Sequence, residues 1–239
     1  EFRDVRPITQ SLLMKDAELS RLSLLSLLTP EQRNGLAPLL QERTFARREI
    51  VATQGETSSF LGFLLEGRLQ GVDFTVDGRE VGLYFVEPGG YYGELAIIDG
   101  KPGAEFVIAL AKSRVALLPR EHARALILSN SHIAEVLLLN LAERVRSGTA
   151  QRTILSLPNV FQRLCAQLLL LGNGSAKIPN APTHQELAIM INTSRETVTR
   201  SFQLLQSQNI LQRDGHSMQI LNQGYLEGIL RGDIAAPKT

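Results

Sequence analysis

The chain has 239 residues, of which 44% are hydrophobic and 21% charged, and its formal net charge is +1. This composition is ordinary for folded proteins and excludes a disordered or fibrous chain, while the length is typical of two domains. The single cysteine excludes an internal disulfide, an all-cysteine metal centre and an iron–sulfur switch, and it indicates a cytoplasmic protein. No apolar run approaches the ~20 residues of a membrane span. Residues 1–15 lack the basic start and apolar stretch of a signal peptide.

The first half of the chain carries a β-rich pattern. Apolar residues between Leu22 and Leu40 recur at steps of three and four, which predicts short accessory helices. From Phe45 to Leu118, short β-rich runs alternate with glycine-bearing turns. The runs are Glu49–Ala52, Phe60–Leu65, Leu69–Phe74, Val81–Phe85, Phe106–Ala109 and Val115–Leu118. This spacing predicts a small antiparallel β jelly roll or barrel.

A long helix is expected between Asn130, an N-cap residue, and Pro158. Seven of its residues recur at alternating steps of four and three, as in the seam of a parallel coiled coil. They are Ala134, Leu138, Leu141, Val145, Gly148, Arg152 and Leu155. The same periodicity fits a helix that packs on its own barrel, so both interpretations stay open. Pro158 ends this helix and Asn159 can cap the next one, which places a domain boundary there.

A helix-turn-helix is predicted from residue 183 onward. Thr183 and Glu186 have the spacing of a capping box, which begins a helix of about two turns. Asn192 tolerates the left-handed conformation that a tight turn between helices requires. Thr193 or Ser194 then caps a second helix.

The start of this second helix is suited to reading DNA. Its apolar face is formed by Val198, Phe202 and Leu205, and its polar residues off that stripe are Arg195, Glu196, Thr199 and Arg200. In a major groove, arginine forks onto guanine O6 and N7, and glutamate accepts from cytosine N4. A solvated charged face is the commoner meaning of such a cluster. The two caps, the turn and a β-wing expected over Leu211–Leu221, around Asp214 and Gly215, favour DNA recognition.

These segments resemble the helix-turn-helix of the CRP/FNR family of transcription regulators. The matching strings are Thr183–Ala188, Asn192–Arg200 and Leu204–Leu211, of which Ser194–Arg200 is the most diagnostic. The resemblance implies that Arg195 and Arg200 contact guanines and that Glu196 contacts a cytosine-bearing step. It further implies that Thr183 and Gln185 hold phosphate, and Ser194 and Thr199 complete the candidate DNA-binding residues. A TGTGA-like palindromic site, a homodimer and RNA polymerase as a partner follow from the same resemblance.

The resemblance covers most of the chain. Gly55, Gly67 and Gly93–Ala96 match the cyclic-nucleotide-binding barrel of the family, and Asn130–Ser156 matches its dimer helix. The expected fold is therefore α+β, with a jelly-roll barrel, a long dimerisation helix and a winged helix-turn-helix. The expected domains are 1–129, with N-terminal helices and the sensor barrel, 130–157, the dimerisation helix, and 158–239, the DNA-binding domain.

One string departs from the family pattern. Cyclic-nucleotide binders carry an Arg-Ser/Thr-Ala cassette whose arginine neutralises the cyclic phosphate, whereas this chain has Gly103, Ala104 and Glu105 there. A phosphate in a partly buried pocket needs a fixed cationic partner, so we expect regulation without cyclic AMP. The candidate effector-pocket residues are Gly93, Glu94, Leu95, Ala104, Glu105 and Thr149. Glu94 fits a ligand contact or a structural carboxylate equally well.

Other functions have weaker support in the sequence. No histidine lies between Phe45 and Leu118, which counts against a cupin-type enzyme with a metal in its barrel, and we expect no enzyme, metal or cofactor. A regulator gated by a cyclic nucleotide or dinucleotide stays open, as does a pure interaction module. His184 is a further possible phosphate contact.

Overall fold

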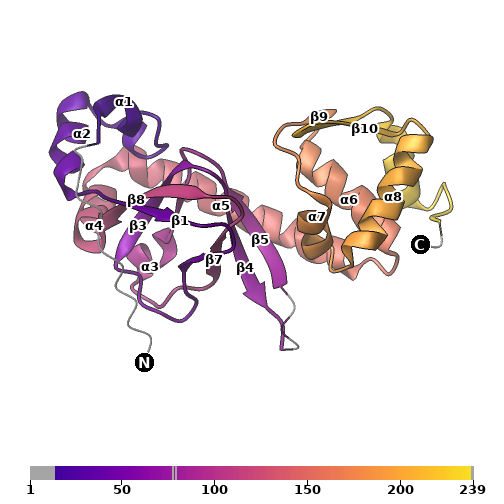
Figure 1. Ribbon diagram of the computed structural model, residues 1–239, viewed down its shortest axis with the longest axis horizontal. Coiled ribbons are helices and arrows are strands. Elements are labelled where there is room, and N and C mark those ends of the chain that lie inside the picture. Colours follow the sequence, from indigo (N-terminus) through magenta and orange to yellow (C-terminus); the bar gives the residue numbers. More distant parts are fainter. Residues whose placement is uncertain (1–13, 77, 79, 238–239) are drawn as a thin grey trace. The chain divides into compact units, whose positions relative to one another are not determined.

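The computed structural model describes residues 14–76, 78 and 80–237 (Figure 1). The chain divides into two compact units. The first comprises residues 1–78 and 83–141, and the second comprises residues 79–82 and 142–239. The division falls within the long helix α5, Ser131–Ser156. The expected domains 1–129, 130–157 and 158–239 stay a prediction. Residues 1–13, where no signal peptide was expected, lie outside the described residues.

Short helices open the first unit, as the spacing between Leu22 and Leu40 predicts. They are α1 (Asp16–Leu19), the 3-10 helix η1 (Leu25–Leu27), α2 (Pro30–Leu36) and the 3-10 helix η2 (Ala37–Leu39). A capping box at Thr29 and Gln32 begins α2, because each side chain bonds the backbone amide of the other residue. Arg33 fixes the helix pair, since its Nε donates to Asp16 at 2.6 Å.

Eight antiparallel strands form two four-stranded sheets, ordered β1-β8-β3-β6 and β2-β7-β4-β5 (Figure 1). The strands are β1 (Gln41–Phe45), β2 (Ile50–Ala52), β3 (Phe60–Glu66), β4 (Leu69–Phe74), β5 (Glu80–Val86), β6 (Tyr91–Tyr92), β7 (Phe106–Ala109) and β8 (Ser113–Pro119). Every predicted β run forms a strand, and the jelly-roll-type fold is confirmed, as two sheets rather than one closed barrel. The sequence did not predict β1 and β6.

Two apolar clusters hold this unit together. One lies between the sheets and includes Phe45, Leu64, Leu69 and Val107. The other joins the N-terminal helices to the sheet, to α4 (Arg120–Ser129) and to the start of α5. Asn130 caps α5 as predicted, because its side-chain oxygen accepts from the amides of His132 and Ile133.

Within the described ranges no single helix is long and apolar enough to cross a membrane. Only α4 and α5 taken together, bent by 100° at the break between them, reach the length and apolar content of a span.

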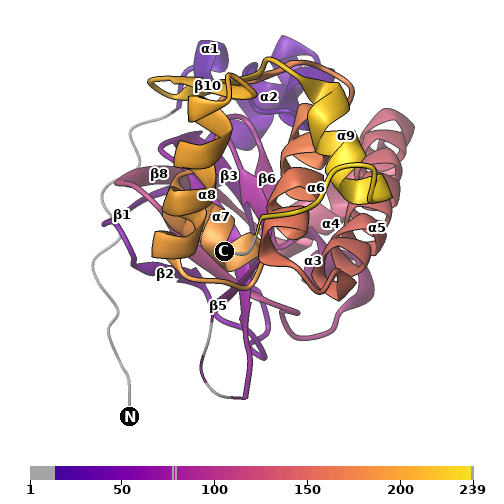
Figure 2. The same ribbon diagram turned by 90° about the vertical axis from the view of Figure 1, so that its right-hand side faces the viewer.

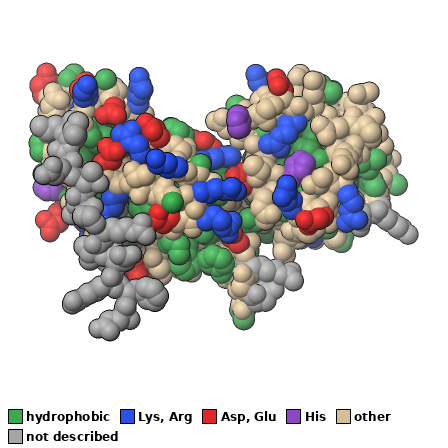
Figure 3. All heavy atoms as spheres, viewed as in Figure 1, with side chains coloured by type: hydrophobic (Ala, Val, Ile, Leu, Met, Phe, Trp, Pro, Cys, Tyr) green, Lys and Arg blue, Asp and Glu red, His purple; other side chains and the backbone are tan. Residues whose placement is uncertain are grey.

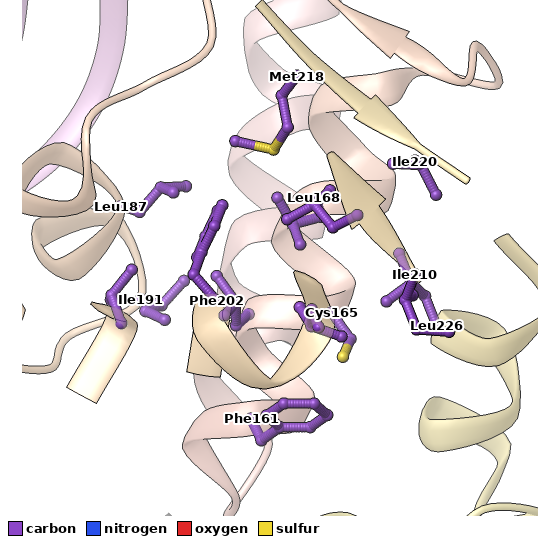
Figure 4. Packing of buried hydrophobic residues seen from close by; sticks show 14 of the residues in the cluster. Phe161, Cys165, Leu168, Leu187, Ile191, Phe202, Ile210, Met218, Ile220 and Leu226 are labelled. Atoms are coloured by element: carbon purple, nitrogen blue, oxygen red, sulfur yellow. The ribbon is translucent and has the colours of Figure 1, made fainter. Parts of the chain in front are cut away.

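The second unit is a three-stranded sheet packed against helices (Figure 2). Its elements are α6 (Val160–Gly172), β9 (Lys177–Ile178), α7 (His184–Met190), α8 (Arg195–Ser207), β10 (Leu211–Asp214), β11 (Ser217–Ile220) and α9 (Gln223–Arg231). Asn159 caps α6 as predicted, accepting from the amide of Phe161 at 2.7 Å. In the core, Phe202 of α8 lies between Leu187 of α7 and Leu168 of α6 (Figure 4). Cys165 is fully buried there, and burial raises the pKa of its thiol to about 12.

Candidate nucleic-acid interface and sensor pocket

The predicted helix-turn-helix is present in α7 and α8. Thr183 and Glu186 form the expected capping box: the Thr183 amide donates to the Glu186 carboxylate at 2.6 Å, and the Glu186 amide donates to the Thr183 hydroxyl. Asn192 takes the left-handed conformation in the turn, with φ of 51°. Ser194, one of the two expected caps, begins α8 by accepting from the amide of Thr197.

Burial of one face of α8 leaves the candidate base-reading residues exposed. Val198 and Phe202 are 1% exposed and Leu205 is fully buried. Arg195, Glu196 and Arg200 are all exposed, and Figure 3 shows basic side chains over α7 and α8 on the face turned to the viewer. Arginine and glutamate side chains at the start of an exposed helix are the groups that read base edges in a major groove.

The other candidate DNA contacts differ in what they already bind. Thr183 and Gln185 are exposed at the start of α7. Thr199 is half-buried, and its hydroxyl donates to the carbonyl of Arg195 at 2.9 Å. The same oxygen lies 3.0 Å from Nδ1 of His184. Because the hydroxyl hydrogen serves Arg195, Nδ1 of His184 is the donor of this second bond.

His184 is therefore held inside the motif rather than free in solvent. Its ring packs against Phe202, with centroids 4.5 Å apart and the ring planes tilted by 42°. Burial lowers the pKa of His184, and the charges of Arg213 and Arg195 lower it further. The imidazole is neutral at pH 7, so His184 acts as a hydrogen-bond donor and not as a second cation at this surface.

Side chains that the sequence analysis missed fix the turn and its approach. Gln151 of α5 donates to the carbonyl of Met190 at 2.6 Å. Arg163 of α6 donates to the carbonyl of Leu157 at 3.1 Å and of Asn192 at 3.4 Å. Each of these bonds satisfies a backbone carbonyl at a helix end or in a turn, where no helical partner exists. Contacts between residues this far apart in sequence leave no local signal.

The wing is held in the same way. Strands β10 and β11 pair around Gly215, as predicted. Arg213 on β10 donates to the carbonyls of Pro182, at 3.1 Å, and Ala181, at 3.3 Å. The wing arginine thus holds the segment that enters α7, and it is not available as a free phosphate contact in this arrangement.

The first unit contains a cavity of about 240 Å³ between its sheets. Four of the predicted effector residues line it: Gly93, Leu95, Ala104 and Glu105. Glu94 is 1% exposed and does not line the cavity, which fits a structural carboxylate better than a ligand contact. Thr149 lies in the other unit, where its hydroxyl donates to the carbonyl of Val145.

Gly103 and Glu105, which stand where the family's phosphate cassette lies, already make hydrogen bonds within the protein. The amide of Gly103 donates to the carbonyl of Glu56 at 2.8 Å. The carboxylate of Glu105 accepts from the hydroxyl of Tyr84 at 2.6 Å. The cavity lining does contain one cation, Arg43, which the sequence analysis missed because it did not predict β1. Within the described ranges, no group of three or more His, Cys, Asp or Glu side chains could hold a metal ion.

Comparison with known proteins agrees with both halves of this description. The family model described as "Cyclic nucleotide-binding domain" matches residues 42–130, and the "Crp-like helix-turn-helix domain" matches residues 162–229. A "CRP-like cAMP-activated global transcriptional regulator" of Mycobacterium tuberculosis is 27% identical over 212 residues, covering 86% of this chain and 95% of the relative. The "Cyclic AMP receptor protein" of Thermus thermophilus is 26% identical over 206 residues, covering 86% and 95%.

A solved structure gives the same fold. FixK2 of Bradyrhizobium japonicum superimposes with a TM-score of 0.66 at 19% identity, covering 83% of this chain and 99% of FixK2. A β-sheet domain of the cyclic-nucleotide-binding type, followed by a winged helix-turn-helix, is the domain organisation of a DNA-binding transcription regulator. The chain belongs to the CRP/FNR family of transcription regulators.

We predict that His184 titrates below its ordinary value of about 6.5 in the folded protein. At pH values between the lowered and the ordinary pKa, the unfolded chain binds more protons than the folded chain. The contribution of His184 to the free energy of unfolding is therefore complete above about pH 6.5 and decreases as the pH falls below that value. NMR titration of the His184 ring should show the lowered value, and Arg213→Gln should raise it by removing a nearby charge. A pKa at or above that of the urea-unfolded chain would contradict the assignment.

Proposed function

We propose that this regulator binds a palindromic TGTGA-like DNA site as a homodimer and that it does so without cyclic AMP. The main support for DNA binding is the exposure of Arg195, Glu196 and Arg200 on a capped helix whose other face is buried. In this proposal the two arginines fork onto guanines, and Glu196 accepts from a cytosine amine. Thr183, Gln185 and Ser194 position the backbone phosphates, which set the register and carry no sequence information.

Two features of the motif support this assignment of roles. The hydroxyl of Thr199 is engaged with Arg195 and His184, so Thr199 supports the helix rather than reading a base through that group. Among the described residues, the hydrogen bond of the Arg200 side chain is a long one, 3.4 Å to the hydroxyl of Thr197. A weakly held, exposed guanidinium can reorient onto a base edge at little cost.

The homodimer rests on α5. Leu138 is 68% exposed and Val145 70% exposed, and the two lie seven residues apart on one side of the helix. Leucine and valine at this spacing form a seam that a second copy would bury. A two-fold dimer would also place two recognition helices on two half-sites one helical turn of DNA apart. We therefore propose α5 as the dimerisation helix.

Independence from cyclic AMP rests on Gly103, Ala104 and Glu105. The relatives compared above are named for cyclic AMP, but here the segment that meets the phosphate in such proteins supplies a carboxylate and no cation. The one arginine in the lining, Arg43, belongs to the opposite sheet. We also propose a cytoplasmic location and RNA polymerase as a partner, because a bacterial regulator of this family acts on DNA there.

Arg195→Ala and Arg200→Ala should each weaken specific DNA binding by about 1 to 3 kcal/mol and relax preference at one guanine per half-site. Gel-shift titrations with a TGTGA-type palindrome and its single-base variants measure both effects. Arg231→Ala, at an exposed arginine of α9, is the matched control and should change little. A loss that is uniform over all probes would make the substituted arginine a phosphate contact.

Leu138→Glu should dissociate the dimer, because it sets two like charges against each other at a two-fold seam. We expect the dimer Kd to rise roughly tenfold or more, and each factor of ten corresponds to ~1.4 kcal/mol. Light scattering at micromolar protein concentration measures the change. Leu128→Glu, at a leucine of α4 that is 73% exposed, controls for the added charge. A wild-type protein that binds DNA fully as a monomer would rule out this seam.

Cyclic AMP should give no low-micromolar binding in calorimetry. Loss of a charge-assisted phosphate contact costs about 2 to 5 kcal/mol, which moves micromolar affinity towards the millimolar range. Cyclic GMP should behave in the same way, and cyclic di-GMP tests the larger-ligand alternative. A clear cyclic AMP isotherm with a matching gain in DNA affinity would overturn this part of the proposal.

A further inference from the structure

Arg43 occupies an unusual position in its sheet. Side chains alternate between the two faces of a strand, so Arg43 and Phe45 share one face of β1. Phe45 belongs to the core between the sheets, and Arg43 pairs in register with Val115, which is fully buried in the same core. The neighbouring Glu42 points the other way, where it binds Arg114 at 2.7 Å. Arg43 is therefore an exposed arginine that lies on the inward face of β1 and lines the cavity.

A second polar group faces the same space. Tyr92 on β6 lines the cavity and is 4% exposed. Its ring lies across β3 where Gly62 leaves room: a Cβ at residue 62 would stand 2.2 Å from Tyr92 Cζ. Arg43 and Tyr92 line the same cavity. Burial raises the pKa of the Tyr92 phenol, and the charge of Arg43 opposes that rise.

Neither group has a polar partner in the part of the chain that the structure describes. Arg43 makes no hydrogen bond or ion pair there, and the Tyr92 hydroxyl makes no hydrogen bond. A buried phenol normally finds a hydrogen-bond partner, and an exposed guanidinium with no internal partner can bind an anion through its fork of N–H donors. The two groups thus form an incomplete site with one positive charge and one hydroxyl donor.

We propose that the cavity binds a small carboxylic acid whose carboxylate is held by Arg43 and Tyr92. This inference rests on the proposed function only in treating the cavity as the sensor of the regulator. A single carboxylate charge matches one guanidinium, which binds it through a planar fork. A doubly charged phosphate fits less well, because Glu56 and Glu105 also line the cavity.

The rest of the lining sets the size and character of the acid. Val51, Leu95 and Val107 offer an apolar surface, and Thr53 and Ser59 add hydroxyls. The cavity volume of about 240 Å³ lies below the range of roughly 300–1,000 Å³ typical of drug-sized ligands. The ligand is therefore a compact acid with a short apolar body, oriented with its charge towards β1 and β6.

The test uses the full-length protein and matched pairs of probes, benzoate with benzamide and hexanoate with hexanamide. Calorimetry and thermal unfolding should show saturable binding of at least one acid, with its neutral amide at least tenfold weaker. Arg43→Gln should weaken the acid at least tenfold and Tyr92→Phe several-fold. Arg47→Gln, at an exposed arginine that lies outside the cavity lining, should leave binding unchanged.

Three results would overturn the inference: no binding of either acid, equal binding of acid and amide, or acid binding that survives Arg43→Gln. Arg43→Gln should keep the unfolding temperature of the ligand-free protein, because the arginine has no structural partner to lose. A large drop in that temperature would assign Arg43 to the fold instead. Gel shifts without additive test DNA binding separately, so failure of the acid site and failure of the DNA proposal are distinguishable.

Discussion

The packing of Phe202 determines what the second unit can present to DNA. Phe202 is 1% exposed, packs against the tilted ring of His184 of α7 and lies against Leu168 of α6 (Figure 4). Because α8 must bury this face, its rotation about its own axis is fixed, and the residues on the opposite side face solvent. The exposure of Glu196 and Arg200 is thus a consequence of core packing. A recognition surface held by a core is better preorganised than one built on loops.

The carbonyl contacts of Gln151, Arg163 and Arg213 extend this constraint beyond the apolar core. Their acceptors lie at the ends of α5 and α7, in the turn, and in the segment before α7. Apolar packing is non-directional, whereas hydrogen bonds to carbonyls fix the position of the backbone. The motif therefore combines a core that sets the helix face with polar side chains that set the path of the chain. Both are needed to hold arginines at a defined distance from a groove.

Local signals in the sequence predicted the second unit better than the first. The caps at Thr183 and Asn159 and the left-handed Asn192 each depend on residues close together in the sequence, so their spacing was sufficient. Strand β1 was missed because Gln41–Thr44 is polar, and only pairing with β8 makes this segment a strand. Arg43 was missed with it. The cavity site joins residues that are 49 positions apart in sequence and lie on the two opposite edge strands of the sheet, so no local pattern encodes it.

The two tyrosines of β6 link the cavity to the long helix. Side chains of adjacent strand residues point to opposite faces, and Tyr92 faces the cavity while the hydroxyl of Tyr91 accepts from Asn140 of α5 at 2.9 Å. The same strand leads into α3 (Glu94–Asp99), whose carbonyls at Ile97 and Ile98 accept from Arg124 of α4. A ligand shifts an equilibrium only by its differential affinity for two states. An acid held by Tyr92 would act on β6, a two-residue edge strand of its sheet, whose Tyr91 is hydrogen-bonded to α5. Strand β6 is therefore the element through which an acid in the cavity would contact the long helix.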